Sequence, residues 1–103
     1  MQKVIITGAS GFIGRRLINK LSGDAGIVSD AVCHKKTGGW PDKGHLNILQ
    51  RDLSCPDSWE DLIEPDCVVV NLVYLWNLPV SENILAARRL IGACRRKGAK
   101  KLI

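Results

Sequence analysis

The chain has 103 residues, enough for one small domain with a single hydrophobic core. Hydrophobic residues make up 46% and charged residues 24%, a balance typical of a folded globular domain rather than a disordered segment. The net charge is +5, no apolar run reaches the length of a membrane span, and glycines interrupt the first apolar run where a signal peptide would continue. We therefore expect a cytoplasmic protein that does not associate with membranes.

The first half of the chain alternates short apolar runs with one amphipathic segment. Runs typical of buried strands occur at residues 3–7, 29–34 and 46–52, the second being the weakest. Between the first two runs, apolar residues recur at helical spacing and predict a helix that ends near Gly23: Phe12, Ile13, Leu17, Ile18 and Leu21.

The second half continues the alternation. Pro56 favours the start of a short helix, with an apolar face of Trp59, Leu62 and Ile63. Residues 67–73 form a continuous apolar run, typical of a strand covered on both faces. A longer helix is then predicted with Ser81 as its N-cap and Gly98 at its end, and its apolar stripe comprises Ile84, Leu85, Leu90, Ile91 and Cys94. A fifth strand begins at residue 100.

This alternation predicts an α/β fold with a parallel sheet and helices on its faces. Right-handed crossovers leave few topologies, and we expect the strand order 3-2-1-4-5 of a Rossmann-like, doubly wound dinucleotide fold. Residues 1–103 are thus predicted to be one domain. The sequence stops as the fifth strand begins, so we expect the sheet to be incomplete at its C-terminal end.

The cysteines and the basic residues show no pattern typical of a separate site. Cys33, Cys55, Cys67 and Cys94 form no CxxC pair and have no histidine at ligand spacing, so we interpret them as reduced thiols without a metal. The basic run at 95–101 fits the C-terminal end of a helix, where cations are favoured, better than a nucleic-acid-binding patch.

Three glycines separate the first predicted strand from the first helix. Gly8 permits an unusual backbone turn, Gly11 allows a phosphate to approach main-chain amides, and Gly14 allows the helix to pack closely. The unpaired amides and positive dipole end of the following helix then favour an anion, most simply a pyrophosphate. The pattern therefore predicts dinucleotide binding; the alternative is a structural turn without a ligand.

The residues "TGASGFIG" (7–14) resemble the glycine motif of the extended and atypical short-chain dehydrogenase/reductase superfamily, specifically its NAD-dependent epimerase/dehydratase family. The resemblance continues through residues 51–72 and 83–103, and so covers nearly the whole chain. It implies the N-terminal, cofactor-binding part of such an enzyme, with NADP or NAD as the cofactor and a small-molecule substrate for the parent enzyme. A homo-oligomer is compatible with it.

The resemblance also implies the roles of individual residues. Asp52 would accept a hydrogen bond from the exocyclic amine of the adenine, and Leu53 would pack on the ring; alternatively, Asp52 caps the next turn. Leu72 and Val73 would lie along the nicotinamide-side ribose. The residues that would surround the pyrophosphate are Gly8, Ser10, Gly11, Phe12, Ile13 and Gly14.

The end of the second strand bears on the choice between NAD and NADP. The acid that usually binds the ribose 2′-hydroxyl is replaced by Lys35, with His34 and Lys36 beside it, whereas Asp30 comes too early. A lysine cannot accept a hydrogen bond from the hydroxyl but can pair with a 2′-phosphate, so NADP is favoured. The alternative is that these residues form a solvated loop.

The catalytic pattern of the family is missing from this sequence. The family uses a tyrosine and a lysine four residues apart, but the only tyrosine, Tyr74, is followed at that distance by Leu78. Two hypotheses remain open: part of a larger oxidoreductase or epimerase/dehydratase-like enzyme, or a non-catalytic dinucleotide-binding module. The second resembles the NmrA-like regulators and the complex I accessory subunit, with which the bulky Tyr74 agrees. Trp76 and Asn77 either line a substrate cleft or simply pack.

Overall fold

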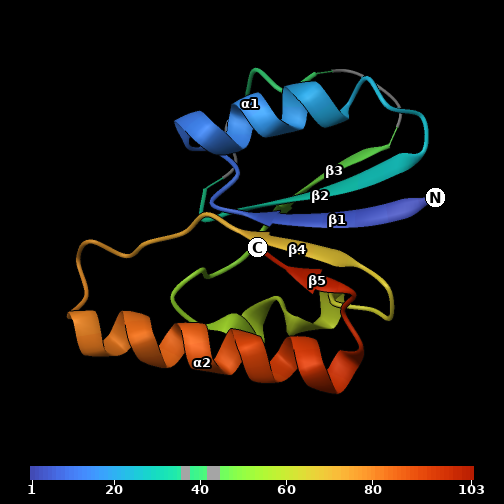
Figure 1. The fold of residues 1–103 in the computed structure, drawn as a ribbon. Helices are drawn as coiled ribbons and strands as arrows, with labels where there is room; N and C mark the ends of the chain where they lie inside the picture. The colour runs from blue at the N-terminus through green and yellow to red at the C-terminus, as the bar shows by residue number, and fades with distance from the viewer. Residues whose placement is uncertain (36–37, 42–44) are drawn as a thin grey trace.

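The computed structural model describes residues 1–35, 38–41 and 45–103. Strands and helices alternate as predicted (Figure 1). The elements are β1 (Gln2–Thr7), α1 (Phe12–Leu21), β2 (Ile27–Cys33), β3 (Leu46–Gln50), the 3-10 segments η1 (Pro56–Ser58) and η2 (Glu60–Leu62), β4 (Val68–Asn71), α2 (Val80–Lys97) and β5 (Lys101–Leu102).

The five strands form one parallel sheet in the order β3-β2-β1-β4-β5, which confirms the predicted topology. Ile5, in the central strand β1, is paired with Asp30 of β2 and with Val69 of β4. Helix α1 covers one face of the sheet, and α2 covers the other together with η1 and η2 (Figure 1). The carboxyl ends of all the strands therefore share one edge, where ligands bind in open α/β sheets.

Alternating side chains of the strands divide the core into two clusters. Ile5 belongs to the cluster beneath α2, with Trp59 and Leu90, whereas Ile6 belongs to the cluster beneath α1, with Ile18. Both isoleucines are fully buried. Because successive strand residues face opposite sides, β1 is covered on both faces, as its continuous apolar sequence requires.

The ends of several elements differ from the predictions. Strand β3 ends at Gln50 and β4 at Asn71, two residues earlier than expected in each case, and the short helix after Pro56 is two 3-10 segments. Helix α2 begins at Val80, with Pro79 rather than Ser81 at the N-cap. The carbonyl of Pro79 accepts hydrogen bonds from the N–H groups of Glu82 and Asn83, so Ser81 already lies inside the first turn. Gly98, at φ +76°, ends α2 as predicted.

Both helices expose part of the apolar stripe that the sequence predicted to be buried. On α1, Phe12 is 75% and Ile13 is 65% exposed, because Gly14 and Ile18 face the sheet instead. On α2, the buried residues are Leu90, Ala93 and Cys94, and the remaining apolar residues of the stripe are partly exposed: Ile84, Leu85 and Ile91. Among the described helices, none is both long and apolar enough to cross a membrane.

A partly buried ion pair lies on the α2 side of the sheet, near its amino-terminal edge. Lys3 Nζ is 3.1 Å from Asp30 Oδ2 and donates a hydrogen bond to the carbonyl of Leu62 at 2.9 Å. Asp30 Oδ1 accepts a second hydrogen bond from the amide of Asn47 at 3.0 Å. Asp30 therefore has a structural role, separate from the carboxyl ends of the strands.

Candidate dinucleotide site

The turn after β1 needs a glycine at position 8. Gly8 has φ +64°, in the left-handed region that other residues rarely adopt. A Cβ at this position would also lie 3.0 Å from the carbonyl carbon of Leu72 and 3.1 Å from the amide nitrogen of Val73. Gly8 thus lets the turn pass directly against the backbone that follows β4.

Gly14 and Gly11 differ in what surrounds them. A Cβ on Gly14 would lie 2.7 Å from the backbone of Ala9, so the helix and the turn can pack only without a side chain there. Among the described residues, a Cβ on Gly11 would meet only the carbonyl oxygen of Gly8, at 3.4 Å, and the φ of −73° at Gly11 suits any residue. The protein itself therefore needs a glycine at 14 but hardly at 11. A ligand lying on the turn would explain Gly11.

The amino-terminal end of α1 is prepared for an anion. Its N-cap is Gly11, which offers no capping side chain, and its first turn contains no acidic residue. The first N–H groups of a helix have no partner within the helix, and the helix dipole makes this end positive. Ser10, Phe12 and Ile13 surround it and are exposed. The residues present therefore fit a pyrophosphate, held by backbone N–H groups at a helix start.

Two polar side chains join the carboxyl ends of β1 and β4. The buried hydroxyl of Thr7 donates a hydrogen bond to Asn71 Oδ1 at 2.6 Å and accepts one from the N–H of Leu72 at 3.2 Å. The turn after β1 and the segment after β4 are thereby held side by side. Leu72 and Val73 follow Asn71 and therefore lie just beyond the end of β4, whereas the sequence predicted them to be the last residues of this strand.

A cleft of about 420 Å³ lies between the segments that follow β3 and β4. Asp52 and Leu53, which the resemblance assigns to the adenine, form one wall, and Val73 forms part of the other. The remaining lining residues are His34, Ser54, Leu75, Asn77 and Leu78. Five of the candidate residues thus lie close together at one edge of the sheet: Leu72 beside Gly8, and Asp52, Leu53 and Val73 around the cleft.

The carboxylate of Asp52 also caps the next turn. Its Oδ1 accepts hydrogen bonds from the backbone N–H of Ser54 at 2.9 Å and from the Ser54 hydroxyl at 2.6 Å. These hydrogen bonds from Ser54 lower the pKa of Asp52, so the group is ionised at neutral pH. The alternative role given to Asp52 is therefore present in the structure, and it fixes the orientation of the carboxylate beside the cleft.

The basic residues after β2 are only partly described. His34 and Lys35 follow Cys33 directly and are exposed at the carboxyl edge of the sheet. Lys36 lies outside the described residues. The exposed position of Lys35 agrees with a solvated loop as well as with a contact to a ligand.

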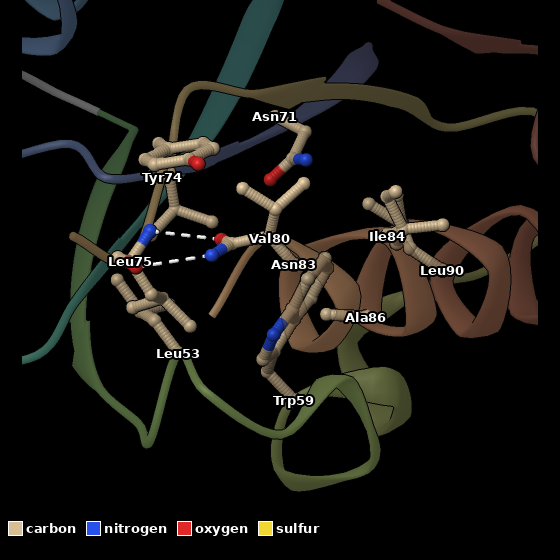
Figure 2. Close-up of a pocket in the computed structure, with 12 residues that line it drawn as sticks. Leu53, Trp59, Asn71, Tyr74, Leu75, Val80, Asn83, Ile84, Ala86 and Leu90 are labelled. Carbon is tan, nitrogen blue, oxygen red and sulfur yellow. Dashed lines mark hydrogen bonds between the residues drawn. The ribbon is translucent and has the colours of Figure 1, made fainter. Parts of the chain in front are cut away.

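A second, mainly apolar pocket of about 270 Å³ lies behind this cleft, against α2 (Figure 2). Leu53, Val73 and Leu75 line both cavities, so they form the wall between them. Asn83 holds Leu75 from the helix: its Oδ1 accepts from the N–H of Leu75 and its Nδ2 donates to the carbonyl, both at 3.0 Å (Figure 2). The indole N–H of the buried Trp59 has no hydrogen-bond partner among the described residues. Sequence reasoning missed Asn83, because only the fold brings it to Leu75.

The aromatic residues after β4 do not pack into the core. Tyr74 and Trp76 form an edge-to-face pair with ring centroids 4.7 Å apart. Trp76 is nevertheless 89% exposed and Tyr74 is 45% exposed. Trp76 therefore does not pack into the core, whereas Asn77 lines the cleft beside Asp52.

Taken together, the glycine turn, the uncapped helix start and the neighbouring cleft define a Rossmann-type dinucleotide-binding domain. The model of the NAD dependent epimerase/dehydratase family matches residues 4–103, and the chain belongs to this family. Its cofactor is therefore NAD or NADP. No curated protein matches the chain in sequence.

Solved structures of dehydrogenases and epimerases share this fold. MoeE5, in complex with UDP-glucuronic acid and NAD, is 28% identical with a TM-score of 0.73, and the match covers 97% of this chain and 35% of that one. The UDP-N-acetylglucosamine 4-epimerase of Methanobrevibacter ruminantium is 26% identical with a TM-score of 0.75, covering 98% and 36%. A mutated uronate dehydrogenase is 26% identical with a TM-score of 0.75, covering 98% and 38%. The chain thus spans little more than a third of each.

Proposed function

We propose that residues 1–103 are the cofactor-binding part of an NAD(P)-dependent oxidoreductase or epimerase/dehydratase, with NADP preferred. The observation that carries the proposal is the glycine at position 11. Its missing side chain leaves space over the turn, and the packing of the described residues does not require this space. The similarity to longer dehydrogenases and epimerases supports the assignment to part of a larger enzyme with a small-molecule substrate. Our proposal further places this enzyme in the cytoplasm and allows it to form a homo-oligomer.

The chain's own residues would bind and orient the cofactor. The backbone N–H groups at the start of α1 would hold the pyrophosphate, with Ser10, Phe12 and Ile13 around it. Asp52 would accept a hydrogen bond from the adenine amine while Leu53 packs on the ring, and Leu72 and Val73 would lie along the nicotinamide-side ribose. When bound, the nicotinamide supplies hydride-transfer chemistry.

The preference for NADP rests on the charge beside the ribose. Lys35 lies just after β2, separated from Cys33 by His34, where an acidic residue would otherwise accept a hydrogen bond from the 2′-hydroxyl. Lys36, next in the sequence, adds a second positive charge. A cation there favours a 2′-phosphate and gives the 2′-hydroxyl of NAD no acceptor.

Calorimetric titration with NADP⁺ and NAD⁺ tests the proposal. We expect both cofactors to bind and NADP⁺ to bind more tightly, and we expect the double variant Lys35→Gln/Lys36→Gln to reduce the preference. Equal affinities in the original protein would contradict the NADP preference. Failure of both cofactors to bind would contradict the proposal as a whole.

A second candidate function is a dinucleotide-binding module without turnover. It is favoured by Tyr74, the only tyrosine, which is exposed beside Trp76 and has Leu78 at the position of the expected lysine. Following NADPH absorbance with small aldehydes, ketones and sugar nucleotides distinguishes the two functions. Cofactor binding without any turnover favours the module, whereas consumption of NADPH favours the enzyme.

A further inference from the structure

The apolar pocket against α2 has an uncharged lining that includes the amide of Asn71. The buried side chains of Leu53, Trp59 and Leu90 form much of its wall, and none of the residues that line it carries a charge. Asn71 is the last residue of β4, and Figure 2 shows its amide group turned toward Val80 of α2. An apolar cavity with a few polar groups is typical of a site for a small molecule.

Thr7, the neighbour of Asn71 in β1, fixes the orientation of this amide. The Thr7 hydroxyl donates its proton to Asn71 Oδ1 at 2.6 Å and accepts a hydrogen bond from the N–H of Leu72. The amide oxygen is therefore held toward β1, and Nδ2 is directed away from it. Within the part of the chain that the structure describes, Asn71 Nδ2 donates no hydrogen bond. A ligand that carries an acceptor can take this bond.

The other polar side chains of the lining are satisfied or out of reach. Asn83 uses both of its N–H groups, one on the carbonyl of Leu75 and the other on that of Pro79. The indole N–H of Trp59 is enclosed by protein atoms. Tyr74 is 45% exposed, so water can serve its hydroxyl. Recognition of a polar group inside the pocket therefore depends on Asn71.

The volume and the lining limit the kind of ligand. The pocket measures about 270 Å³. A cavity of about 150 Å³ holds one benzene molecule, so this pocket has room for a single ring with a short substituent. A charged group would lose its hydration here without gaining an ionic partner, which is costly. An uncharged ring with one hydrogen-bond acceptor therefore fits best.

We infer that the apolar pocket is a second binding site, separate from the dinucleotide site, for a small uncharged ring compound that carries a carbonyl group. Asn71 Nδ2 donates a hydrogen bond to this carbonyl, and the ring packs against Trp59 and Leu90. Val73 and Leu75 separate the site from the cleft beside Asp52, so it does not require a bound cofactor.

NMR titration of the isotope-labelled full chain with acetophenone tests the inference. We expect a saturable shift of the indole N–H resonance of Trp59, which Trp59→Phe identifies, with a dissociation constant of about 1 mM or lower. The resonance of Trp40, which packs beneath α1 on the other face of the sheet, should not move. The absence of a saturable Trp59 shift would overturn the inference.

Two further compounds test the chemistry of the site. Toluene has the same ring without the carbonyl, so it should bind about three- to tenfold more weakly than acetophenone. Benzoate carries a charge and should not bind. If toluene binds as tightly as acetophenone, the hydrogen bond to Asn71 is refuted, and if benzoate binds as tightly, the assignment to uncharged ligands is refuted. These comparisons use the original protein and do not depend on the folding of a variant.

A pair of variants locates the bound ring. Ala86 lines the apolar pocket but not the cleft, whereas Leu78 lines the cleft but not the pocket. Ala86→Leu should fill the pocket and abolish acetophenone binding while the thermal unfolding midpoint is retained. Leu78→Ala should leave this binding unchanged. The reverse result would place acetophenone in the cleft and overturn the inference.

Asn71→Asp tests the donor itself. This change keeps an oxygen for the Thr7 hydroxyl but replaces the N–H donor with a second oxygen. We expect the affinity for acetophenone to fall about three- to tenfold and that for toluene to change less than about twofold. Equal losses for both compounds would show that Asn71 only shapes the wall, and would overturn its role as the donor. Cofactor binding without acetophenone binding would overturn the inference and leave the proposed function intact.

Discussion

A Cβ atom on Gly14 would lie 2.7 Å from both the Cα and the carbonyl oxygen of Ala9. Real Cβ atoms do not approach backbone this closely, so Gly14→Ala must push α1 away from the turn. Overpacking of this kind costs about 2 kcal/mol in the free energy of unfolding, even after the better helix propensity of alanine is counted. Urea unfolding measures the effect. An unchanged urea midpoint in Gly14→Ala would contradict this prediction, because it would show that α1 can move away from the turn without loss of stability.

Gly11→Val should affect binding rather than folding. Gly11 has an extended backbone and open space beside it, so the valine side chain fits the protein but occupies the space proposed for the pyrophosphate. We expect the unfolding free energy to change by less than about 1 kcal/mol and the affinity for NADP⁺ to fall at least tenfold. Gly38→Val, at a glycine whose Cβ position has no atom of the described residues within 4 Å, is the control. Undiminished affinity in Gly11→Val would contradict the proposed site.

The ionisation of Asp52 predicts a specific pH dependence. Ser54 lowers the folded-state pKa of this carboxyl, so the stability that it contributes is present above the unfolded-state pKa of about 3.9 and is lost as the pH falls through the folded-state value. The carboxylate remains available to the adenine amine throughout the range from pH 8 to 5. We expect the affinity for 5′-ADP to be lower in Asp52→Asn than in the original protein at every pH in this range. Calorimetry at several pH values measures this, and an unaltered affinity in Asp52→Asn would leave Asp52 only its capping role.

The pair of Lys3 and Asp30 should contribute strongly to stability. Asp30 is almost fully buried, and Lys3→Met would leave its charge facing Glu64, whose Oε2 lies 3.8 Å from Lys3 Nζ in the intact protein. Removing one partner of such a pair costs about 3 kcal/mol, somewhat less than for a completely buried pair because Lys3 is partly exposed. The double variant Lys3→Met/Asp30→Leu should recover much of this loss. Additive losses in a double-mutant cycle would contradict the coupling.

The buried thiols should make the protein sensitive to alkaline pH. Burial raises the folded-state pKa of Cys94. It also raises the folded-state pKa of Cys33, although the positive charge of Arg15 opposes part of this rise. The stability that they contribute is present below the unfolded-state pKa of about 8.5 and is lost as the pH rises through the folded-state values. We expect the unfolding free energy to fall above about pH 8.5. At pH 8, iodoacetamide should modify the half-exposed Cys55 before the three buried cysteines, and simultaneous modification of all four would contradict this burial.

Local sequence was sufficient to predict the topology. Residues 12–21 form the predicted helix because the glycine turn precedes a clear 3.6-residue apolar period, and the alternation of elements led to the observed strand order. The side-chain environment was harder to predict. Phe12 and Ile13 belong to the apolar period, yet the helix is oriented with Gly14 toward the sheet, so both side chains are exposed. A periodicity shows that a helix has an apolar face, but not which part of this face contacts the sheet.

The residues that the sequence did not reveal act between different elements of the chain. Asn83 holds Leu75 through two hydrogen bonds, and Arg15 stacks on Trp40 across 25 positions of the chain. Neither pair has a local motif, because the fold rather than the spacing brings the partners together. The glycines and Asp52 could be found because the turns that contain them are formed by consecutive residues.

The wall formed by Leu53, Val73 and Leu75 has a mechanical consequence. Because this wall lies between the two cavities, displacing it toward α2 would widen the cleft beside Asp52 and narrow the apolar pocket against the helix. Leu75 is anchored to the first turns of α2 by Asn83, so such a displacement would strain the helix start and should alter the exchange of its amide hydrogens with deuterium.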